Sequence, residues 1–210
     1  VKPIIDQTKI ELTVTTTGLE FLDTSHPIPK VLEGVKRIKP LGDEFDFYSI
    51  LKRYDGKKVD HAPISPDDIA LLSYTSGTTG PPKGAMNTHY NVFWNSRNYK
   101  YLLQLNEDDV ILGIAPLFHI TGEIAHIAIF LYSGAPLILA YRFEAGEMLR
   151  LIEKWKATTT VAAITAYIAL LNHPDIRKRD LSSFKKIASG GAPIPPAIVG
   201  QWRKITGAYI

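Results

Sequence analysis

The stretch Tyr74–Gly84 reads YTSGTTGPPKG. Its first residue, Tyr74, is also the last residue of a short apolar run, Ile69–Tyr74, that is typical of a buried strand. Seven of its eleven residues are glycine, threonine or serine, two are proline and one is lysine. A helical pattern begins soon afterwards, near Thr88. Glycines let backbone N–H groups approach phosphate oxygens, hydroxyls add donors and a lysine adds positive charge. This order of strand, polar loop and helix predicts a phosphate-binding loop at residues 75–84, called the phosphate loop below.

The phosphate loop does not match a Walker A motif, which needs Gly, four residues and then Gly-Lys-Ser/Thr. Counted from Gly77, the second glycine position holds Pro82, and Lys83 is followed by Gly84. No hydroxyl residue therefore stands in the position that would bind the metal, and a P-loop NTPase is disfavoured. The ordinary alternative is a flexible surface loop rich in small residues.

Composition limits the classes of protein to which the chain can belong. Its 210 residues, 45% hydrophobic and 21% charged, are enough for one substantial core in one domain or part of one. A net charge of +3 is too small to indicate nucleic acid as a partner. The absence of cysteine excludes disulfides and thiol catalysis, and permits a cytoplasmic location. No signal or transit sequence is recognised.

From residue 66 onward the pattern predicts an α/β core with a largely parallel sheet and flanking helices. Expected strands are Ile69–Tyr74, Val110–Ile114, Leu137–Ala140, Thr159–Ala163 and Lys185–Ala188. One helix is expected to begin at Thr88 and another to span Ile120–Tyr132. Three more are expected through Met148–Trp155, Tyr167–Leu171 and Ile198–Ile205, and the last of these lies between Pro196 and Gly207. The most apolar region, Ile124–Tyr141, is interrupted by Ser133–Pro136, so it predicts helix, turn and strand instead of a membrane span.

Residues 1–65 are predicted to form a less regular lead-in. Ile10–Val14 alternates like a strand. Phe47 and Tyr54 lie at the ends of an i, i+3, i+4, i+7 pattern that predicts a helix of about three turns, with Asp43 near its start.

Three polar, glycine-rich loops follow predicted strands, at residues 75–84, 116–122 and 189–193. Ligands of parallel sheets bind at the carboxyl ends of the strands, so these loops are expected to share one rim. In the second loop, His119 is either a core histidine or a functional one. His119, Glu123 and His126 at i, i+4 and i+7 also allow a zinc site. The spacing is not His-Glu-x-x-His, so helix packing and surface exposure are the ordinary interpretation and no metal ligand is assigned.

The phosphate loop resembles the signature of the adenylate-forming (acyl-activating) enzyme superfamily, aromatic-Thr-Ser-Gly-Thr-Thr-Gly-x-Pro-Lys-Gly, at every defined position. Pro116-Leu-Phe-His119 is similar to the element that borders the carboxylate substrate in the acyl- and aryl-CoA ligase branch. Peptide-synthetase adenylation domains have Phe-Asp there, where the Asp holds an amino group, so His119 implies a substrate without an α-amino group. Ser189–Pro193 resembles the adenine-binding segment, and the three motifs occur in the family's order.

The resemblance covers roughly Asp67 to Gly207 and includes one departure. Ala163-Ile164 stands where the family usually has Val-Pro, which affects the expected wall of the acyl pocket. The family's magnesium-binding Glu, ribose-binding Asp and C-terminal lysine are not found in these residues. We therefore expect residues 1–210 to be a fragment of the larger N-terminal domain, without the C-terminal domain and inactive alone.

The resemblance implies an acyl-CoA synthetase that uses ATP, Mg²⁺ and coenzyme A, with a fatty acid as the first expectation for the carboxylic acid. It assigns catalysis to Lys83 and His119. It implies nucleotide binding by Thr75, Ser76, Gly77, Thr78, Thr79, Gly80, Lys83, Gly190, Gly191, Ala192 and Pro193. The alternatives are a non-catalytic nucleotide-binding module, or a ligase for aryl or short-chain acids. A homodimer and peripheral membrane contact both stay open.

Overall fold

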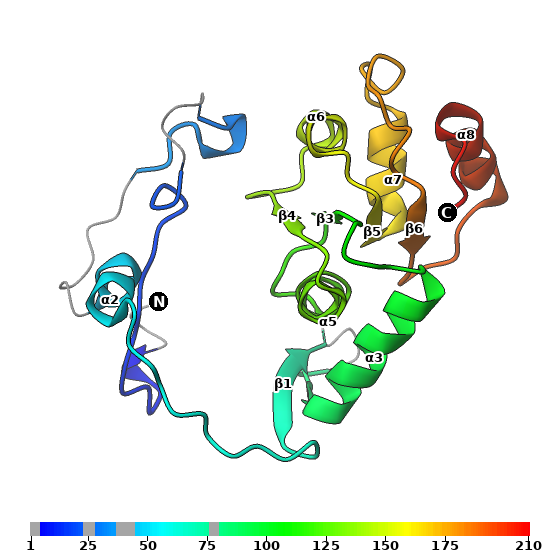
Figure 1. The fold of residues 1–210 in the computed structure, drawn as a ribbon. Coiled ribbons are helices and arrows are strands. Elements are labelled where there is room, and N and C mark those ends of the chain that lie inside the picture. Colours follow the sequence, from blue (N-terminus) through cyan, green and yellow to red (C-terminus); the bar gives the residue numbers. More distant parts are fainter. Residues whose placement is uncertain (1–4, 23–27, 37–44, 76–79) are drawn as a thin grey trace. The chain divides into compact units, whose positions relative to one another are not determined.

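The computed structural model describes residues 5–22, 28–36, 45–75 and 80–210 (Figure 1). The chain divides into two compact units, Val1–Ala62 and Pro63–Ile210. The motifs identified in the sequence all belong to the second unit.

The first unit contains little regular structure among its described residues: a short 3-10 turn, η1 (Lys30–Leu32), and helix α2 (Phe47–Tyr54). The Asp46 side chain caps α2 by accepting hydrogen bonds from the Ser49 N–H (3.0 Å) and hydroxyl (2.8 Å). The predicted helix is confirmed, but its eight residues make about two turns, not three. Asp43 lies outside the described residues.

The predicted strand Ile10–Val14 is wrong. These residues have no regular structure, and pairing is limited to an isolated parallel bridge between Thr15 and Asp46. An alternating pattern forms a strand only where a partner strand supplies the ladder hydrogen bonds, and the described part of this unit contains none.

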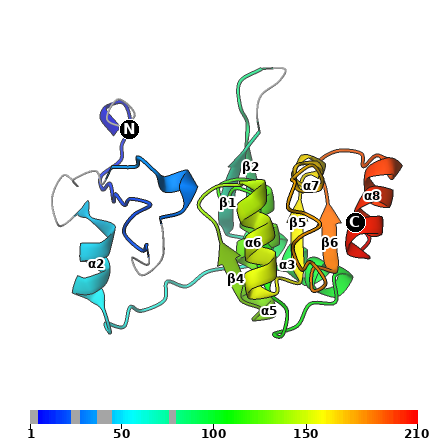
Figure 2. The same cartoon turned by 90° about the horizontal axis from the view of Figure 1, so that it is seen from above.

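The second unit is built on a four-stranded parallel sheet of order β4-β3-β5-β6. Its strands are β3 (Ile111–Gly113), β4 (Leu137–Leu139), β5 (Thr159–Ala162) and β6 (Lys186–Ser189). The predicted α/β class with a parallel sheet and flanking helices is thereby confirmed. Figure 2 shows β5 and β6 side by side, as the register Thr159↔Lys186 to Ala162↔Ser189 requires.

The predicted helices of this unit are also present. They are α3 (His89–Leu102), α4 (Ile120–Gly122), the π-helix η3 (Glu123–Ala128), α5 (Ile129–Ser133), α6 (Ala145–Trp155), α7 (Ile164–Leu171) and α8 (Pro196–Thr206). Thr88 caps α3, and Gly207 ends α8 with a φ of 74°. The region predicted as one helix changes from α to π and back. Among the described residues, no helix combines the length and the apolar character needed to cross a membrane.

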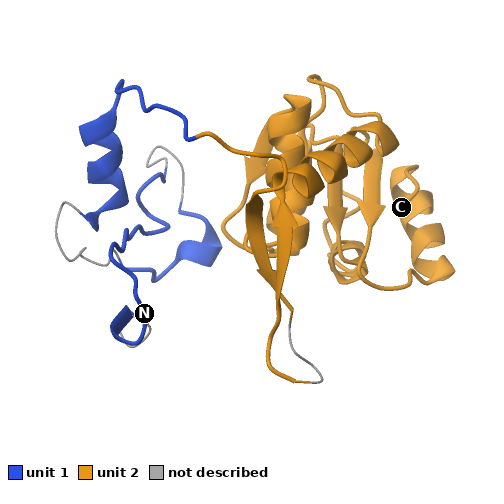
Figure 3. Ribbon diagram, turned by 90° about the horizontal axis from the view of Figure 1, so that it is seen from below, with its two compact units in different colours: residues 1–62 blue, residues 63–210 orange. Residues whose placement is uncertain are grey.

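The strand before the phosphate loop differs from its prediction. β1 (Ile69–Tyr74) lies outside the parallel sheet and pairs antiparallel with β2 (Gly84–Thr88) within the second unit, which is orange in Figure 3. None of the residues of β1 is fully buried. Nothing in the pattern Gly84-Ala-Met-Asn-Thr88 predicts β2, because the stretch has a single β-branched residue. The phosphate loop therefore connects two strands of a hairpin, and α3 follows the second strand.

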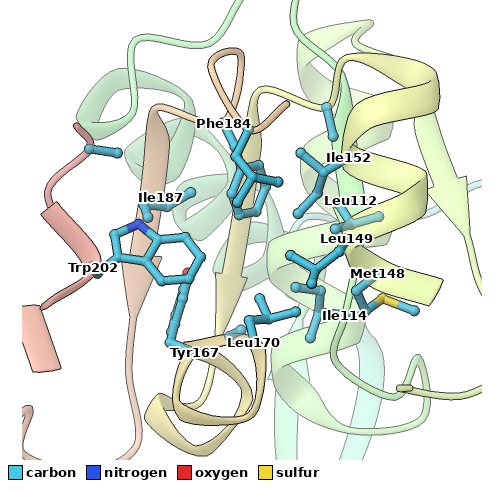
Figure 4. Close-up of a cluster of buried hydrophobic side chains, with 14 of the residues drawn as sticks. Leu112, Ile114, Met148, Leu149, Ile152, Tyr167, Leu170, Phe184, Ile187 and Trp202 are labelled. Carbon is cyan, nitrogen blue, oxygen red and sulfur yellow. The ribbon is translucent and has the colours of Figure 1, made fainter. Parts of the chain in front are cut away.

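The core lies on both faces of the parallel sheet, and the alternation of side chains along the strands explains why. Leu112 and Ala162 pack with the residues of α6, α7 and α8 on one face (Figure 4). Their neighbours Ile111 and Val161 pack with Ala125 of η3 and Ile129 of α5 on the opposite face. Strands buried on both faces are rich in apolar and β-branched residues, as in Ile111–Gly113 and Thr159–Ala162, which is why these short runs could be recognised in the sequence.

The Asp109 carboxylate links the N-terminal ends of three strands, β3, β5 and β6. Its carboxylate accepts hydrogen bonds from Lys186 Nζ (2.7 Å), Thr158 Oγ1 (2.8 Å) and the Asn106 N–H (2.9 Å). Burial alone would raise the pKa of Asp109, but these hydrogen bonds and the Lys186 charge outweigh burial and lower it. The carboxylate is thus held in its charged form at neutral pH.

We expect Asp109→Asn to lower the free energy of unfolding by about 1–3 kcal/mol, because a buried charged acceptor is lost beside Lys186. Denaturant unfolding at pH 7 measures this value. Asp108→Asn, at the exposed neighbouring position, is the matched control and should change stability by less than about 0.5 kcal/mol. Equal effects of the two substitutions would contradict the assignment.

Candidate functional site

The base of the phosphate loop is closed by two hydrogen bonds. The Thr75 N–H donates to the Lys83 carbonyl (2.9 Å), and the Lys83 N–H donates to Thr75 Oγ1 (3.3 Å). The side chain of Lys83 is exposed, as is Gly80, where a Cβ atom would meet nothing within 4 Å. The predicted site residues Ser76, Gly77, Thr78 and Thr79 lie outside the described residues.

His119 lies in the loop that follows β3. Its backbone N–H donates to the Pro116 carbonyl (3.0 Å). Its ring Nδ1 accepts from the Thr121 N–H (3.1 Å), so the His119 side chain caps α4. In a neutral imidazole this arrangement puts the proton on Nε2. The ring is exposed, so Nε2 is able to donate to a ligand bound beside the loop.

Gly122 fixes how closely this loop approaches the helical segment behind it. A Cβ atom at Gly122 would lie 2.1 Å from the Pro116 carbonyl oxygen and 2.7 Å from Leu117 Cα. Real Cβ atoms do not come so close to backbone atoms, so only glycine fits at this contact. The sequence shows a glycine inside a helical pattern, which hints at such a contact but does not identify its partner.

His126 holds the same loop through its backbone, a role that the sequence did not indicate. It is fully buried, and its Nε2 accepts a hydrogen bond from the Ala115 N–H (3.1 Å) at the start of the loop. Its Nδ1 is buried with no hydrogen-bond partner among the described residues. Burial lowers the pKa of His126 from 6.5 to about 4, so the ring is neutral at pH 7. The sequence offered His126 only as a possible metal ligand or as a helix-packing residue.

The three residues of the zinc alternative have different partners. His119 Nδ1 and His126 Nε2 each accept from a backbone N–H, and Glu123 Oε2 accepts from the Ser73 hydroxyl (2.8 Å). Within the described parts of the chain, no three histidine, aspartate or glutamate side chains form a group that could hold a metal ion. The structure therefore offers no support for a zinc site at this helix.

The segment predicted to face adenine follows β6. The Gly190 N–H continues the ladder by donating to the Ala162 carbonyl (3.4 Å), and Gly191 has a φ of 85°, which a glycine adopts without strain. Beneath the end of the strand, the buried Tyr167 hydroxyl donates to the Ala188 carbonyl (2.9 Å). Burial raises the pKa of Tyr167, so this hydroxyl stays protonated.

The loops after β3 and β6 meet at one cavity of about 540 Å³. It is lined by Ile114, Ala115, Pro116, His119, Thr121, Phe143, Ala162, Ala163, Ile164, Thr165, Ala166, Gly190, Gly191 and Ala192. Two of the three predicted loops thus share a site. The described residues of the phosphate loop do not line it, and neither does Pro193.

The wall of the cavity contains Ala163 and Ile164, where the sequence departs from the family's usual Val-Pro. Phe118 is 90% exposed and Tyr167 is fully buried, and neither lines the cavity. Among the described lining residues, His119 is the single titratable one.

The chain matches the family described as AMP-binding enzyme over residues 1–210. It belongs to this family. The resemblance of the phosphate loop to the adenylate-forming superfamily and its acyl-CoA synthetase branch is confirmed by this match and by the relatives.

Two relatives and one solved structure illustrate the range of AMP-binding enzymes to which the chain is similar. It is 38% identical over 167 residues to a long-chain-fatty-acid–CoA ligase of Bacillus subtilis (strain 168), covering 78% of this chain and 30% of that protein. It is 39% identical over 140 residues to a feruloyl-CoA synthase of Amycolatopsis sp, covering 67% and 28%. The crystal structure of ATP-bound MatB from Rhodopseudomonas palustris superposes with a TM-score of 0.68 at 29% identity, covering 77% and 32%.

The chain therefore spans about a third of the length of these AMP-binding enzymes. The part that it spans includes the phosphate loop, the His119 loop and the Gly190–Ala192 segment.

The buried His126 makes stability depend on pH. Its pKa is about 4 when folded and 6.5 when exposed, so its contribution is complete above pH 6.5 and is lost as the pH falls toward 4. We expect the wild type to lose up to roughly 3 kcal/mol more than His126→Gln over this range, because glutamine does not titrate. Urea unfolding from pH 7 to pH 4 measures both proteins. Parallel pH profiles would show that His126 does not titrate as assigned.

The contact at Gly122 predicts a large effect from one methyl group. Gly122→Ala should lower the free energy of unfolding by about 1–3 kcal/mol, since the added Cβ must displace the loop backbone. Gly200→Ala, inside α8 with nothing within 4 Å of the added atom, is the control and should stabilise by about 0.5–1 kcal/mol. Thermal unfolding measures the two variants. A stabilised Gly122→Ala protein would refute the close contact.

Proposed function

We propose that the protein containing this chain activates a carboxylic acid with ATP and then transfers the acyl group to coenzyme A. The observation that carries the proposal is the shared cavity, where the His119 loop and the Gly190–Ala192 segment meet in a chain of the AMP-binding enzyme family. The sequence of the phosphate loop and the fixed base of its hairpin support the same conclusion.

In the proposed first step, a carboxylate oxygen attacks the α-phosphorus of ATP, and the bond from that phosphorus to the β-phosphate oxygen breaks. The products are acyl-adenylate and pyrophosphate. In the second step the sulfur of coenzyme A forms a bond to the acyl carbon, the thiol proton is lost, and AMP leaves. Developing negative charge on the leaving pyrophosphate is what the protein must stabilise.

Each site residue has a proposed part in these steps. The backbone and hydroxyl donors of Thr75, Ser76, Gly77, Thr78, Thr79 and Gly80, with the charge of Lys83, bind the β- and γ-phosphates. His119 borders the carboxylate and donates to it from Nε2. Gly190, Gly191, Ala192 and Pro193 face adenine. The described residues hold no cluster of three metal-binding side chains, so no ligand in this chain is assigned to Mg²⁺, which is bound in many enzymes through substrate phosphates.

The cavity favours an acid with an apolar body. Ile114, Phe143 and the alanines of the β5–α7 segment line it, and the described lining residues include no carboxylate that could bind an amino group. The Bacillus relative is named for long-chain fatty acids and the Amycolatopsis relative for ferulate. We propose a fatty acid first, with aryl or short-chain acids as the alternative.

We further propose that these 210 residues are a fragment of the N-terminal domain of a cytoplasmic ligase that also has a C-terminal domain, and that they are inactive alone. The chain spans about a third of the length of its relatives, which supports this proposal. Turnover of ATP and a fatty acid by residues 1–210 alone would overturn it.

The test is ATP–pyrophosphate exchange by the full-length protein with aromatic acids and with C2–C18 fatty acids. We expect exchange that depends on one class of acid. Lys83→Ala should reduce it by about 10- to 100-fold because a charge beside the leaving pyrophosphate is lost. Lys204→Ala, which removes a charge from an exposed position on α8, is the control.

ATP binding without exchange for any acid would contradict the proposed chemistry. It would favour a nucleotide-binding module without catalytic activity, which is the second candidate function. Equal loss of exchange in the two lysine variants would contradict the role of Lys83 in particular.

A further inference from the structure

The π-helix η3 (Glu123–Ala128) lies between two of the proposed binding loops in the chain's three-dimensional structure. π-helices are rare in proteins and often mark functional sites, because the extra residue per turn changes where side chains point. Two polar side chains leave this helix in different directions. Glu123 contacts β1, and His126 contacts the loop after β3.

The Glu123 contact reaches the base of the phosphate loop. Glu123 Oε2 accepts a hydrogen bond of 2.8 Å from Ser73 Oγ, which lies two residues before Thr75 in a hairpin whose described residues are exposed or half-buried. The start of the hairpin is also joined to α3, because the His89 N–H donates to the Asp68 carbonyl (3.0 Å). The Ser73–Glu123 hydrogen bond, between residues that are 50 positions apart, is a separate contact that links the hairpin to η3.

The His126 contact reaches the loop that carries His119. Nε2 of His126 accepts from the Ala115 N–H, and one turn earlier Gly122 meets the Pro116 carbonyl. Both contacts hold backbone atoms, so they fix the path of the loop independently of its side chains. Because Glu123 and His126 belong to one rigid helical turn, a shift at one contact is passed to the other.

We propose that Ser73, Glu123 and His126 are positioning residues that set the phosphate loop and the His119 loop relative to each other. The inference rests on the proposed function, in which these loops bind the triphosphate and the carboxylate. Attack by the carboxylate on the α-phosphorus needs the two ligands in line, and a displacement of about 1 Å can cost about 100-fold in rate. Loss of this coupling should therefore slow the chemical step while each ligand still binds.

Steady-state ATP–pyrophosphate exchange by the full-length protein provides the first readout. Ser73→Ala and Glu123→Ala should each lower kcat by about tenfold and leave the KM for ATP and for the acid within about twofold, since relative placement and not binding is affected. The double variant should be no slower than either single variant, because both remove the same contact. Glu123→Gln should restore kcat, since the glutamine oxygen still accepts from Ser73.

A matched pair of substitutions tests the other end of the helix. The amide of glutamine places an acceptor near Nε2 of the histidine it replaces, whereas that of asparagine lies nearer Nδ1. His126→Asn should therefore lower kcat by about tenfold, and His126→Gln should recover most of it. A residue that only filled space in the core would show no such difference between the two amides.

The second readout does not depend on catalysis. In the ligand-free protein, Ser73→Ala should shift the NMR signals of the Ala115 amide and the His119 ring, although Ser73 forms no hydrogen bond with either. Ser183→Ala is the control, because it removes a hydroxyl that donates to the Ala157 carbonyl elsewhere in the same unit. It should leave both signals unchanged.

These readouts separate the two proposals. Suppose that the wild type catalyses ATP–pyrophosphate exchange and that Ser73→Ala keeps its kcat, or changes only the KM for one ligand. The positioning role is then overturned and the proposed function stands. If the wild type shows no exchange with any acid, the proposed function fails, and the NMR shifts alone decide whether the contacts couple the loops. Unchanged shifts would then overturn the inference as well.

Discussion

The candidate site depends on the close approach between the π-helix segment and the loop that follows β3. Gly122 permits the Pro116 carbonyl to lie where a side chain would otherwise be, and the buried His126 ring accepts from the Ala115 N–H. The first contact is steric and the second is a directional hydrogen bond, and together they restrict the path of the loop backbone. The backbone of His119 is set by that path, and its ring is oriented by Thr121. The position of His119 at the cavity therefore depends on these two contacts.

Burying His126 has an energetic cost. The ring is kept neutral by burial, and among the described residues Nδ1 has no hydrogen-bond partner. An apolar side chain of similar size would remove both costs, but it could not accept from the Ala115 N–H. At Tyr167 a hydroxyl is likewise buried, and it holds the carbonyl at the end of β6. His126 and Tyr167 thus each place a buried polar group beneath a loop that lines the cavity.

Much of the fold could be predicted because its determinants are local. Short runs of apolar and β-branched residues such as 110–114 and 159–163 are buried on both faces of a parallel sheet, and Thr88 and Gly207 mark helix ends by their own chemistry. The errors came from elements whose structure depends on a distant partner. Ile10–Val14 alternates without a neighbour to pair with, and β2 forms from a weak strand sequence because β1 lies opposite. Similarly, the motifs identified the candidate site residues, but the spacing of His126 did not indicate that its ring accepts a hydrogen bond from the Ala115 N–H.

The hairpin of β1 and β2 shows why a phosphate loop can be held firmly at its base without being part of the core. Its ladder pairs Tyr74 with Gly84, where a Cβ atom would come within 3.3 Å of the tyrosine ring, and the next pair is closed by the Thr75–Lys83 hydrogen bonds. These bonds fix the shape of the hairpin but not its direction, because none of its described residues is fully buried. The orientation of the hairpin must come from its contacts with the rest of the unit, and the Ser73–Glu123 hydrogen bond is one such contact. A loop that must approach a highly charged ligand has to stay exposed, so a hydrogen-bonded tether at its base suits it better than burial does.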